Sequence, residues 1–112
     1  MLSLWWQPVL SWALSAFFAL GSWFNARDPK SIAEYRTWGF PDWFHFVTAA
    51  MELATAALLI LAATRLYGAG LGCIVMFGAT LTLLVHDEYS HALLPMAIFA
   101  LLATVGWAAF HA

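Results

Sequence analysis

One acidic residue lies in the middle of a long apolar stretch of this chain. Glu52 is surrounded by Phe, Val, Ala, Met and Leu in the run HFVTAAMELAT. A carboxyl group in such surroundings is expected either to be protonated or to be hydrogen-bonded to a neighbour or a bound molecule, because an unpaired charge is costly to bury. Glu52 is therefore a candidate for ligand binding and for proton transfer.

Three further polar residues share a predicted helix face with Glu52. They are His45, Thr48 and Thr55, and the four residues follow one another at spacings of three, four and three. These spacings place them on one stripe of an α-helix. Since exposing a charged group to lipid costs several kcal/mol, we expect the stripe to face other helices. The alternative is that Glu52 only ties helices together, through Thr80 or a serine of the first helix.

A second polar cluster, HDEYSH, follows the third apolar segment. Glu88 and His91 are three residues apart, and we predict that they gather with His45 and His86 at one membrane face, above Glu52. Glu-x-x-His is half of the ligand set of a di-iron bundle, but only one copy is present. A mononuclear metal site formed by His45, Glu88 and His91 is conceivable. The missing second motif favours hydrogen-bonded histidines and no metal.

Four apolar segments must position these side chains, at about 4–24, 41–63, 66–85 and 91–110. Each has about 20 residues, which spans a hydrocarbon core of roughly 30 Å. The chain of 112 residues is 64% hydrophobic and only 9% charged, against roughly 45–50% and about 25% in soluble domains. We therefore predict an all-α, multi-pass integral membrane protein in a lipid bilayer, a four-helix bundle forming one transmembrane domain over residues 1–112.

The long polar linker between the first two segments is predicted to contain a short interfacial helix at about 31–38. Ser31 and Glu34 match the S-x-x-E capping box that often starts a helix. In the first apolar segment, Pro8 is expected to lie in the first turn of the helix, where proline is tolerated.

Two glycines and a proline in the later segments bear on how the predicted helices pack and where the last one begins. Gly68 and Gly72 are four residues apart, a pattern that lets membrane helices approach closely. Pro95 has two interpretations: either the last helix already includes His91 and is kinked, or it begins near Leu93 with Pro95 in its first turn.

Charge and cysteine content limit the possible partners. The net charge of −2 argues against nucleic acid, which usually requires a basic surface. Cys73 is the single cysteine, so the chain cannot form an intramolecular disulfide or a C-x-x-C pair. Arg27, Lys30 and Arg36 in the first linker are opposed by Arg65 at the other membrane face, which leaves the orientation unresolved.

From Trp38 onward the sequence resembles the DoxX-like family of small membrane proteins. The similar stretches are WGFPDWFHFVTAAMELATAALLI, TRLYGAGLGCIVMFGATLT and ALLPMAIFALLA, and the most specific features are Glu52 with Leu53, then Thr64 with Arg65. The resemblance implies a four-helix membrane bundle in the bacterial inner membrane. It also implies a role as a small subunit of a thiosulfate:quinone oxidoreductase or of an oxidative-stress complex, with Glu52 as the shared polar position. Distant relatives include a receptor assembly factor.

Two functions follow as the main hypotheses. In the first, the polar stripe binds a lipophilic molecule such as a quinone or a lipid, while Trp43, Phe44 and Trp38 hold its apolar body. The protein would then be a membrane subunit of a redox complex, and a partner would supply electrons. In the second, the protein is an assembly factor or chaperone that contacts another membrane protein, or a second copy of itself. The contacts would use small-residue helix faces and the amphipathic first linker.

Overall fold

The computed structural model describes residues 2–111, with side chains from Trp6 onward. The chain is all-α, as predicted, and the described part contains no strand. Its elements are α1 (Leu2–Arg27), α2 (Pro29–Thr37), α3 (Phe44–Ile60), the 3-10 turn η1 (Ala62–Thr64), α4 (Arg65–Val85) and α5 (Tyr89–Phe110).

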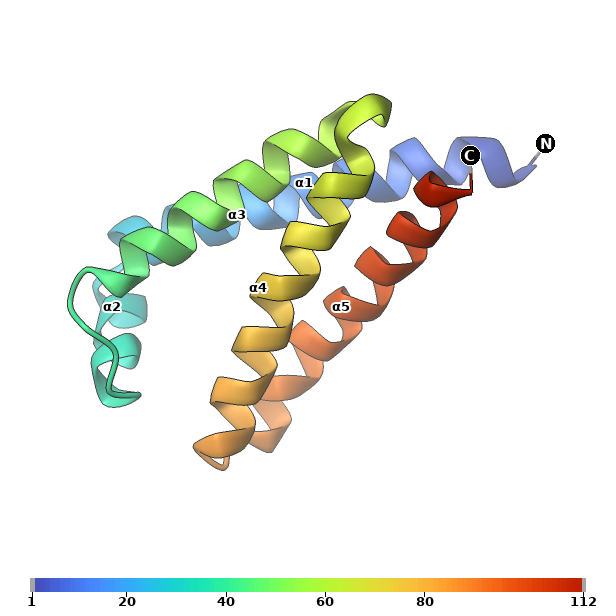
Figure 1. Cartoon of the computed structure of the whole chain (residues 1–112). Coiled ribbons are helices and arrows are strands. Elements are labelled where there is room, and N and C mark those ends of the chain that lie inside the picture. Colours follow the sequence, from blue (N-terminus) through green and yellow to red (C-terminus); the bar gives the residue numbers. More distant parts are fainter. Residues whose placement is uncertain (1, 112) are drawn as a thin grey trace.

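The long helices form two antiparallel pairs (Figure 1). In one pair α1 packs along α3, and in the other α4 packs along α5. The pairs are joined through the short α3–α4 connection, and the two helices diverge away from it, while α2 lies at the far end of α3. The fully buried side chains Phe18, Leu59, Leu102 and Val105 form the centre of the core.

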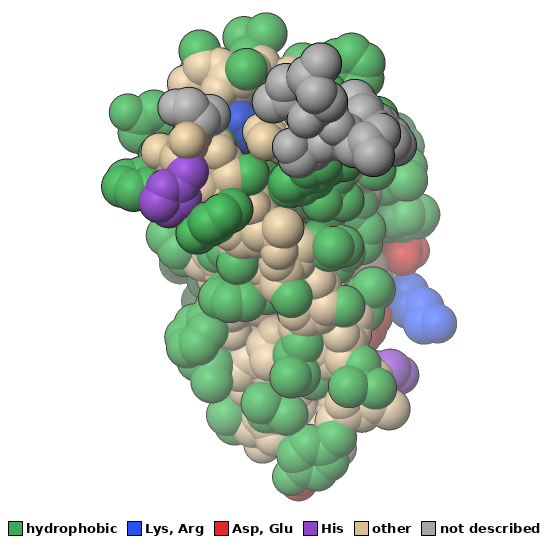
Figure 2. All heavy atoms as spheres, turned by 90° about the vertical axis from the view of Figure 1, so that its right-hand side faces the viewer, with side chains coloured by type: hydrophobic (Ala, Val, Ile, Leu, Met, Phe, Trp, Pro, Cys, Tyr) green, Lys and Arg blue, Asp and Glu red, His purple; other side chains and the backbone are tan. Residues whose placement is uncertain are grey.

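The outside of the molecule is apolar. Apolar side chains cover much of the face shown in Figure 2, and large side chains such as Val85 and Phe110 are more than two thirds exposed, at 74% and 71%. Exposed apolar surface of this extent indicates a lipid environment. Three helical segments are long and apolar enough to cross a membrane: Trp6–Arg27, Ala62–Val85 and Tyr89–Phe110.

The second predicted span is shorter than expected. We predicted a helix over 41–63, but α3 has 17 residues, Phe44–Ile60. Residues 41–43 form a turn, and Leu61 is extended, with φ −95° and ψ 136°. With α2, residues 2–111 contain five α-helices, so the description as a four-helix bundle fits only in part.

Side chains hydrogen-bond to the last carbonyls of α3, which have no partner within the helix. The guanidinium of Arg65, which is buried, donates through Nε to Leu59 O at 3.2 Å and through Nη2 to Ile60 O at 3.3 Å. Trp12 and Thr64 donate to carbonyls of the same turn. The C-terminal end of α3, which comes earlier in the chain than predicted, is therefore stabilised from two sides. Trp12 is distant in the sequence, and Thr64 and Arg65 follow the helix directly.

The start of α2 differs from the predicted capping box. Asp28 is the N-cap and Pro29 the first helical residue, and the Asp28 carboxylate accepts hydrogen bonds from Lys30 N at 3.3 Å and Ser31 Oγ at 3.2 Å. Proline suits the first helical position and holds the residue before it in an extended conformation. Ser31 therefore lies inside the helix and donates to the cap.

Gly68 and Gly72 of α4 pack closely against other helices, as predicted. A methyl group added to Gly68 would lie 2.9 Å from the backbone nitrogen of Leu59, and one added to Gly72 would lie 2.9 Å from Cδ1 of Leu102. Gly68 thus permits the close approach of α3, and Gly72 that of α5.

Pro8 and Pro95 lie inside helices. Pro8 is not in the first turn, as we expected, because α1 already begins at Leu2. Pro95 lies within α5, which includes His91, so the first of the two interpretations holds. Proline lacks the N–H that would otherwise bond to the carbonyl four residues earlier, and this leaves the carbonyl of His91 without its usual helical partner.

Candidate functional site

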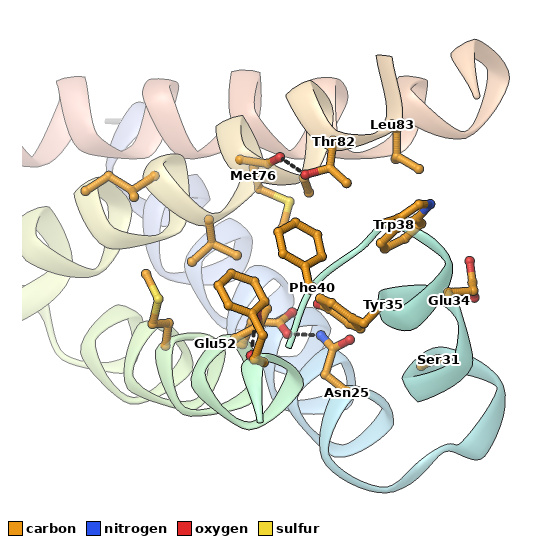
Figure 3. A pocket seen from close by; sticks show the side chains of 17 residues that line it. Asn25, Ser31, Glu34, Tyr35, Trp38, Phe40, Glu52, Met76, Thr82 and Leu83 are labelled. Atoms are coloured by element: carbon orange, nitrogen blue, oxygen red, sulfur yellow. Dashed lines mark hydrogen bonds between the residues drawn. The ribbon is translucent and has the colours of Figure 1, made fainter. Parts of the chain in front are cut away.

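A cavity of about 400 Å³ lies between α3 and α4, near the ends at which they diverge. The segment from α2 to Phe40 lies across it, and α1 contributes one residue, Asn25 (Figure 3). The lining residues are Asn25, Ser31, Glu34, Tyr35, Trp38, Phe40, Phe44, Thr48, Met51, Glu52, Ile74, Val75, Met76, Gly78, Ala79, Thr82 and Leu83.

Glu52 lines this cavity together with Asn25 and Thr48, and its side chain faces inward as the stripe predicted. The residue is only 4% exposed. Asn25 donates a hydrogen bond from Nδ2 to Oε1 of Glu52, and the other oxygen occupies the space left by Gly21, where a methyl group would lie 2.5 Å from Oε2. The helix partner of the acid is therefore Asn25, not Thr80 or a serine.

The polar stripe of α3 is divided between the cavity and the α1 interface. Thr48 lines the cavity together with Glu52. His45 is buried against α1, with Nδ1 2.8 Å from the backbone oxygen of Asn25. Thr55 is fully buried and donates to Met51 O at 2.9 Å. Of the four stripe residues, two contact the cavity and two pack between helices.

Aromatic rings form a further part of the cavity lining. The ring of Tyr35 lies 5.5 Å from that of Trp38 and 5.8 Å from that of Phe40, and Phe40 stacks on Phe44 at 4.4 Å. Burial raises the pKa of the Tyr35 phenol, although hydrogen bonding with Thr48 opposes this effect. Tyr35 therefore keeps its O–H at neutral pH and is a hydrogen-bond donor at the cavity.

Trp43 is placed differently from the other aromatic residues of the linker. Its side chain is 61% exposed and does not line the cavity. Trp38 and Phe44, which we grouped with it, do line the cavity. Only these two of the three are placed to hold the body of a molecule bound there.

Glu88 and His91 lie outside the cavity, at its rim. Trp38 donates from Nε1 to Oε2 of Glu88 at 2.8 Å, and His91 Nδ1 lies 3.2 Å from Oε1 of the same carboxylate. The hydrogen bond from Trp38, followed by that with His91, lowers the pKa of Glu88. These contacts tether the segment after α2 to the turn between α4 and α5.

Of the four residues predicted to gather at one membrane face, Glu88 and His91 contact each other. His45 instead packs against the α1 backbone, and His86 contacts the carbonyl of Thr82 in its own helix at 2.8 Å. Within residues 2–111 no three His, Cys, Asp or Glu side chains are grouped so that they could hold a metal ion.

A family model described as "DoxX-like family" matches residues 9–105, which is most of the chain. The chain belongs to the DoxX-like family. The match includes most of α1. The similarity noted in the sequence began only at Trp38. No curated protein and no solved structure matches the chain.

The cavity of this DoxX-like protein has a mainly apolar lining with a few polar side chains. The carboxyl of Glu52, the hydroxyl of Thr48 and the phenol of Tyr35 supply hydrogen-bonding groups. Among the described residues, no Lys, Arg or His lines the cavity. Such a site suits an uncharged molecule with an apolar body and one or two oxygen atoms that form hydrogen bonds.

Sequence reasoning missed Asn25 and Tyr35 as residues of this site. Asn25 is a polar residue near the end of an otherwise apolar helix, and that signal was present in the sequence. Its pairing with Glu52 joins residues that are 27 positions apart, so it depends on how α1 and α3 align. Tyr35 was predicted only as a membrane-surface residue of the linker.

Proposed function

We propose that this DoxX-like membrane protein binds a quinone, or a closely similar lipid-like molecule, in the cavity at Glu52, and that it serves as the membrane subunit of a quinone-linked redox complex. The observation that carries the proposal is the cavity itself. Its volume of about 400 Å³ falls within the range of roughly 300–1,000 Å³ typical of small-molecule sites. A carboxyl group lies at its inner end.

Each side chain at the cavity has a role under this proposal. The Tyr35 phenol, which stays protonated, donates a hydrogen bond to a carbonyl oxygen of the ligand. The carboxyl of Glu52 gives or accepts a proton when the ligand is reduced or oxidised, because it is the acid buried at the inner end. Trp38 and Phe44 offer aromatic surface to the ring of the ligand.

Electrons would come from another subunit. The reduction of a quinone consumes electrons as well as protons, and a pair of thiols cannot form within a chain that has only Cys73. The proposal therefore assigns binding and proton exchange to this chain and electron delivery to a partner.

The first experiment measures the ligand directly. The protein is purified gently, and its bound lipids are extracted and identified by mass spectrometry. The delipidated protein in nanodiscs is then titrated with a short-tailed quinone, and the quenching of tryptophan fluorescence is followed. We expect stoichiometric quinone in the extract and a saturable titration. A non-saturable titration with no extracted quinone would contradict the proposal.

A substitution tests the role of Glu52. The Glu52→Gln variant keeps the shape and still has an oxygen that can accept from Asn25, but it loses the acidic proton. We expect quinone binding to weaken by about tenfold, which is the effect of one hydrogen bond to an ionisable group. Thr104→Val, on the exposed face of α5, is the control and should bind as the unmodified protein does. If Glu52→Gln bound quinone with the same affinity as the unmodified protein, the proposed role of Glu52 in binding would be wrong.

The hypothesis of an assembly factor receives less support from the contacts. One of its two contact surfaces was a small-residue helix face, the other being the amphipathic first linker. Gly68 and Gly72, which define that face, pack against α3 and α5 of the same chain. Close approach of another helix at these two glycines is therefore blocked within this protein.

A further inference from the structure

The outer edge of the cavity is formed by one side of α4. Ile74 and Gly78 both line the cavity, and both are exposed, Ile74 by 63%. They are four residues apart and thus share a helix face. A methyl group added at Gly78 would have no other atom within 4 Å. The cavity is therefore continuous with the outer surface of the molecule at this edge.

This edge faces lipid rather than water. Gly78 is seven residues before Val85, the end of α4, or roughly 10 Å along a helix that rises 1.5 Å per residue. It lies within the segment Ala62–Val85, which is apolar enough to span a membrane. Its exposed neighbours Phe77 and Leu81 are large and apolar. A molecule leaving the cavity past Gly78 would enter the acyl region of the bilayer.

The charges of the lining limit the kind of headgroup that can enter. Its ionisable side chains with a potential negative charge are Glu34 and Glu52, and within the described residues no cationic side chain lines the cavity. A phosphate or a fatty-acid carboxylate would find no positive partner there, and burying a charge without a partner is costly. An uncharged headgroup meets no such penalty.

From these observations, and resting on the function proposed above, we propose that Gly78 is a lateral portal. The uncharged headgroup of an isoprenoid quinone enters from the bilayer between α3 and α4, and its tail remains in the opening beside Ile74 and Gly78. Gly78 would then set the selectivity for tailed ligands, because any side chain at this position would project into the path of the tail.

The chain offers a matched control in the same helix. Gly70 is also exposed, and a methyl group there would also have no atom within 4 Å, but Gly70 does not line the cavity. Gly78→Leu and Gly70→Leu therefore make the same chemical change on α4. Only the change at Gly78 would obstruct the edge of the cavity. Ile74→Trp provides a second block on a side chain that is already exposed.

The experiment compares two probes in nanodiscs. One is a tailless dimethoxy-methyl-benzoquinone, and the other carries the same headgroup with an isoprenoid tail of several units. We expect Gly78→Leu and Ile74→Trp to weaken binding of the tailed probe by roughly tenfold or more, comparable with the misfit of a few methylene groups. Binding of the tailless probe should change less than about twofold, and Gly70→Leu should leave both probes unaffected. An excess of fatty acid should not displace the tailed probe.

The outcomes separate the portal from the proposed function. If the unmodified protein binds neither probe, the function proposed above fails. If it binds both, but Gly78→Leu and Ile74→Trp bind the tailed probe normally, the portal is wrong and the function stands. An equal loss for both probes would also overturn the portal, because it would show that the added side chains fill the headgroup site. Thermal melting of every variant by circular dichroism identifies any that do not fold.

Discussion

The crossing of α3 and α4 at Gly68 can be tested by adding a single methyl group. In Gly68→Ala the new carbon would lie 2.9 Å from Cβ of Leu58 and 2.9 Å from the backbone nitrogen of Leu59. Carbon atoms in contact are normally about 3.5–4.0 Å apart. Because one of the atoms belongs to the backbone, a change of rotamer cannot relieve the clash. The two helices must separate by about half an ångström or more.

The cost follows from two opposing effects. Forcing an extra methyl group into a packed interface typically costs about 1–3 kcal/mol, while replacing glycine by alanine within a helix gains about 1 kcal/mol. In Gly70→Ala the gain is the same, but the clash is missing, since no atom lies within 4 Å of the added carbon. The difference between the two variants therefore isolates the steric cost. We expect Gly68→Ala to be less stable than Gly70→Ala by about 1–3 kcal/mol.

The measurement is reversible unfolding in mixed micelles of a mild detergent and dodecyl sulfate, followed by circular dichroism. Both variants and the unmodified protein are unfolded under the same conditions, so the surrounding detergent affects them equally. If Gly68→Ala unfolds within about 0.5 kcal/mol of Gly70→Ala, a margin typical of surface substitutions, the close crossing is refuted. The explanation that α3 and α4 diverge towards the cavity from a close crossing at Gly68 would then also be wrong.

Three further changes test other contacts of the site and the fold. In Gly21→Ala the added methyl group would lie 2.5 Å from Oε2 of Glu52, so the carboxyl group must turn away. We expect this variant to melt at nearly the normal temperature. Its affinity for quinone should fall about as much as that of Glu52→Gln. Arg65→Met removes the hydrogen bonds to the last carbonyls of α3 and should destabilise the protein by about 1–3 kcal/mol in the unfolding assay above; an unchanged stability would refute the capping role. Trp38→Phe removes the main cause of the lowered pKa of Glu88, so NMR titration should show that pKa rising towards its ordinary value. In the unmodified protein the Trp38–Glu88 bond, which favours the ionised carboxylate, should be fully formed above the ordinary pKa of glutamate and should weaken as pH falls through the lowered value.

The sequence was sufficient to predict the elements whose origin is local. Long apolar runs predicted the membrane helices, and the spacing of Gly68 and Gly72 in α4 predicted close packing. The linker helix was also predicted, but its start was not, because Asp28 and Pro29 together are a stronger start signal than Ser31 and Glu34. The early end of α3 escaped prediction for a different reason. The carbonyls at that end are satisfied by the buried Arg65, and this contact forms only when the chain folds back after the helix.

The candidate site was predicted only in part because residues on one stripe of a helix can contact different neighbours. Helical periodicity places His45, Thr48, Glu52 and Thr55 on one side of α3. It does not tell which of them meets a packed helix and which meets a cavity. In the structure α1 covers His45, while Thr48 and Glu52 border the space towards α4. That division depends on the positions of two neighbouring helices, which a single sequence does not encode locally.

The shape of the α3–α4 pair connects the packing at one end with the cavity at the other. Two helices that cross at an angle are closest at the crossing point and separate with distance from it. Gly68 brings the backbones together near the connection, and about ten residues further along α4, near Gly78, the helices enclose the cavity. The rings of Tyr35 and Phe40 fill part of this space. Because both features belong to one pair of helices, we expect Gly68→Ala to alter quinone binding as well as stability, whereas Gly70→Ala should impair neither.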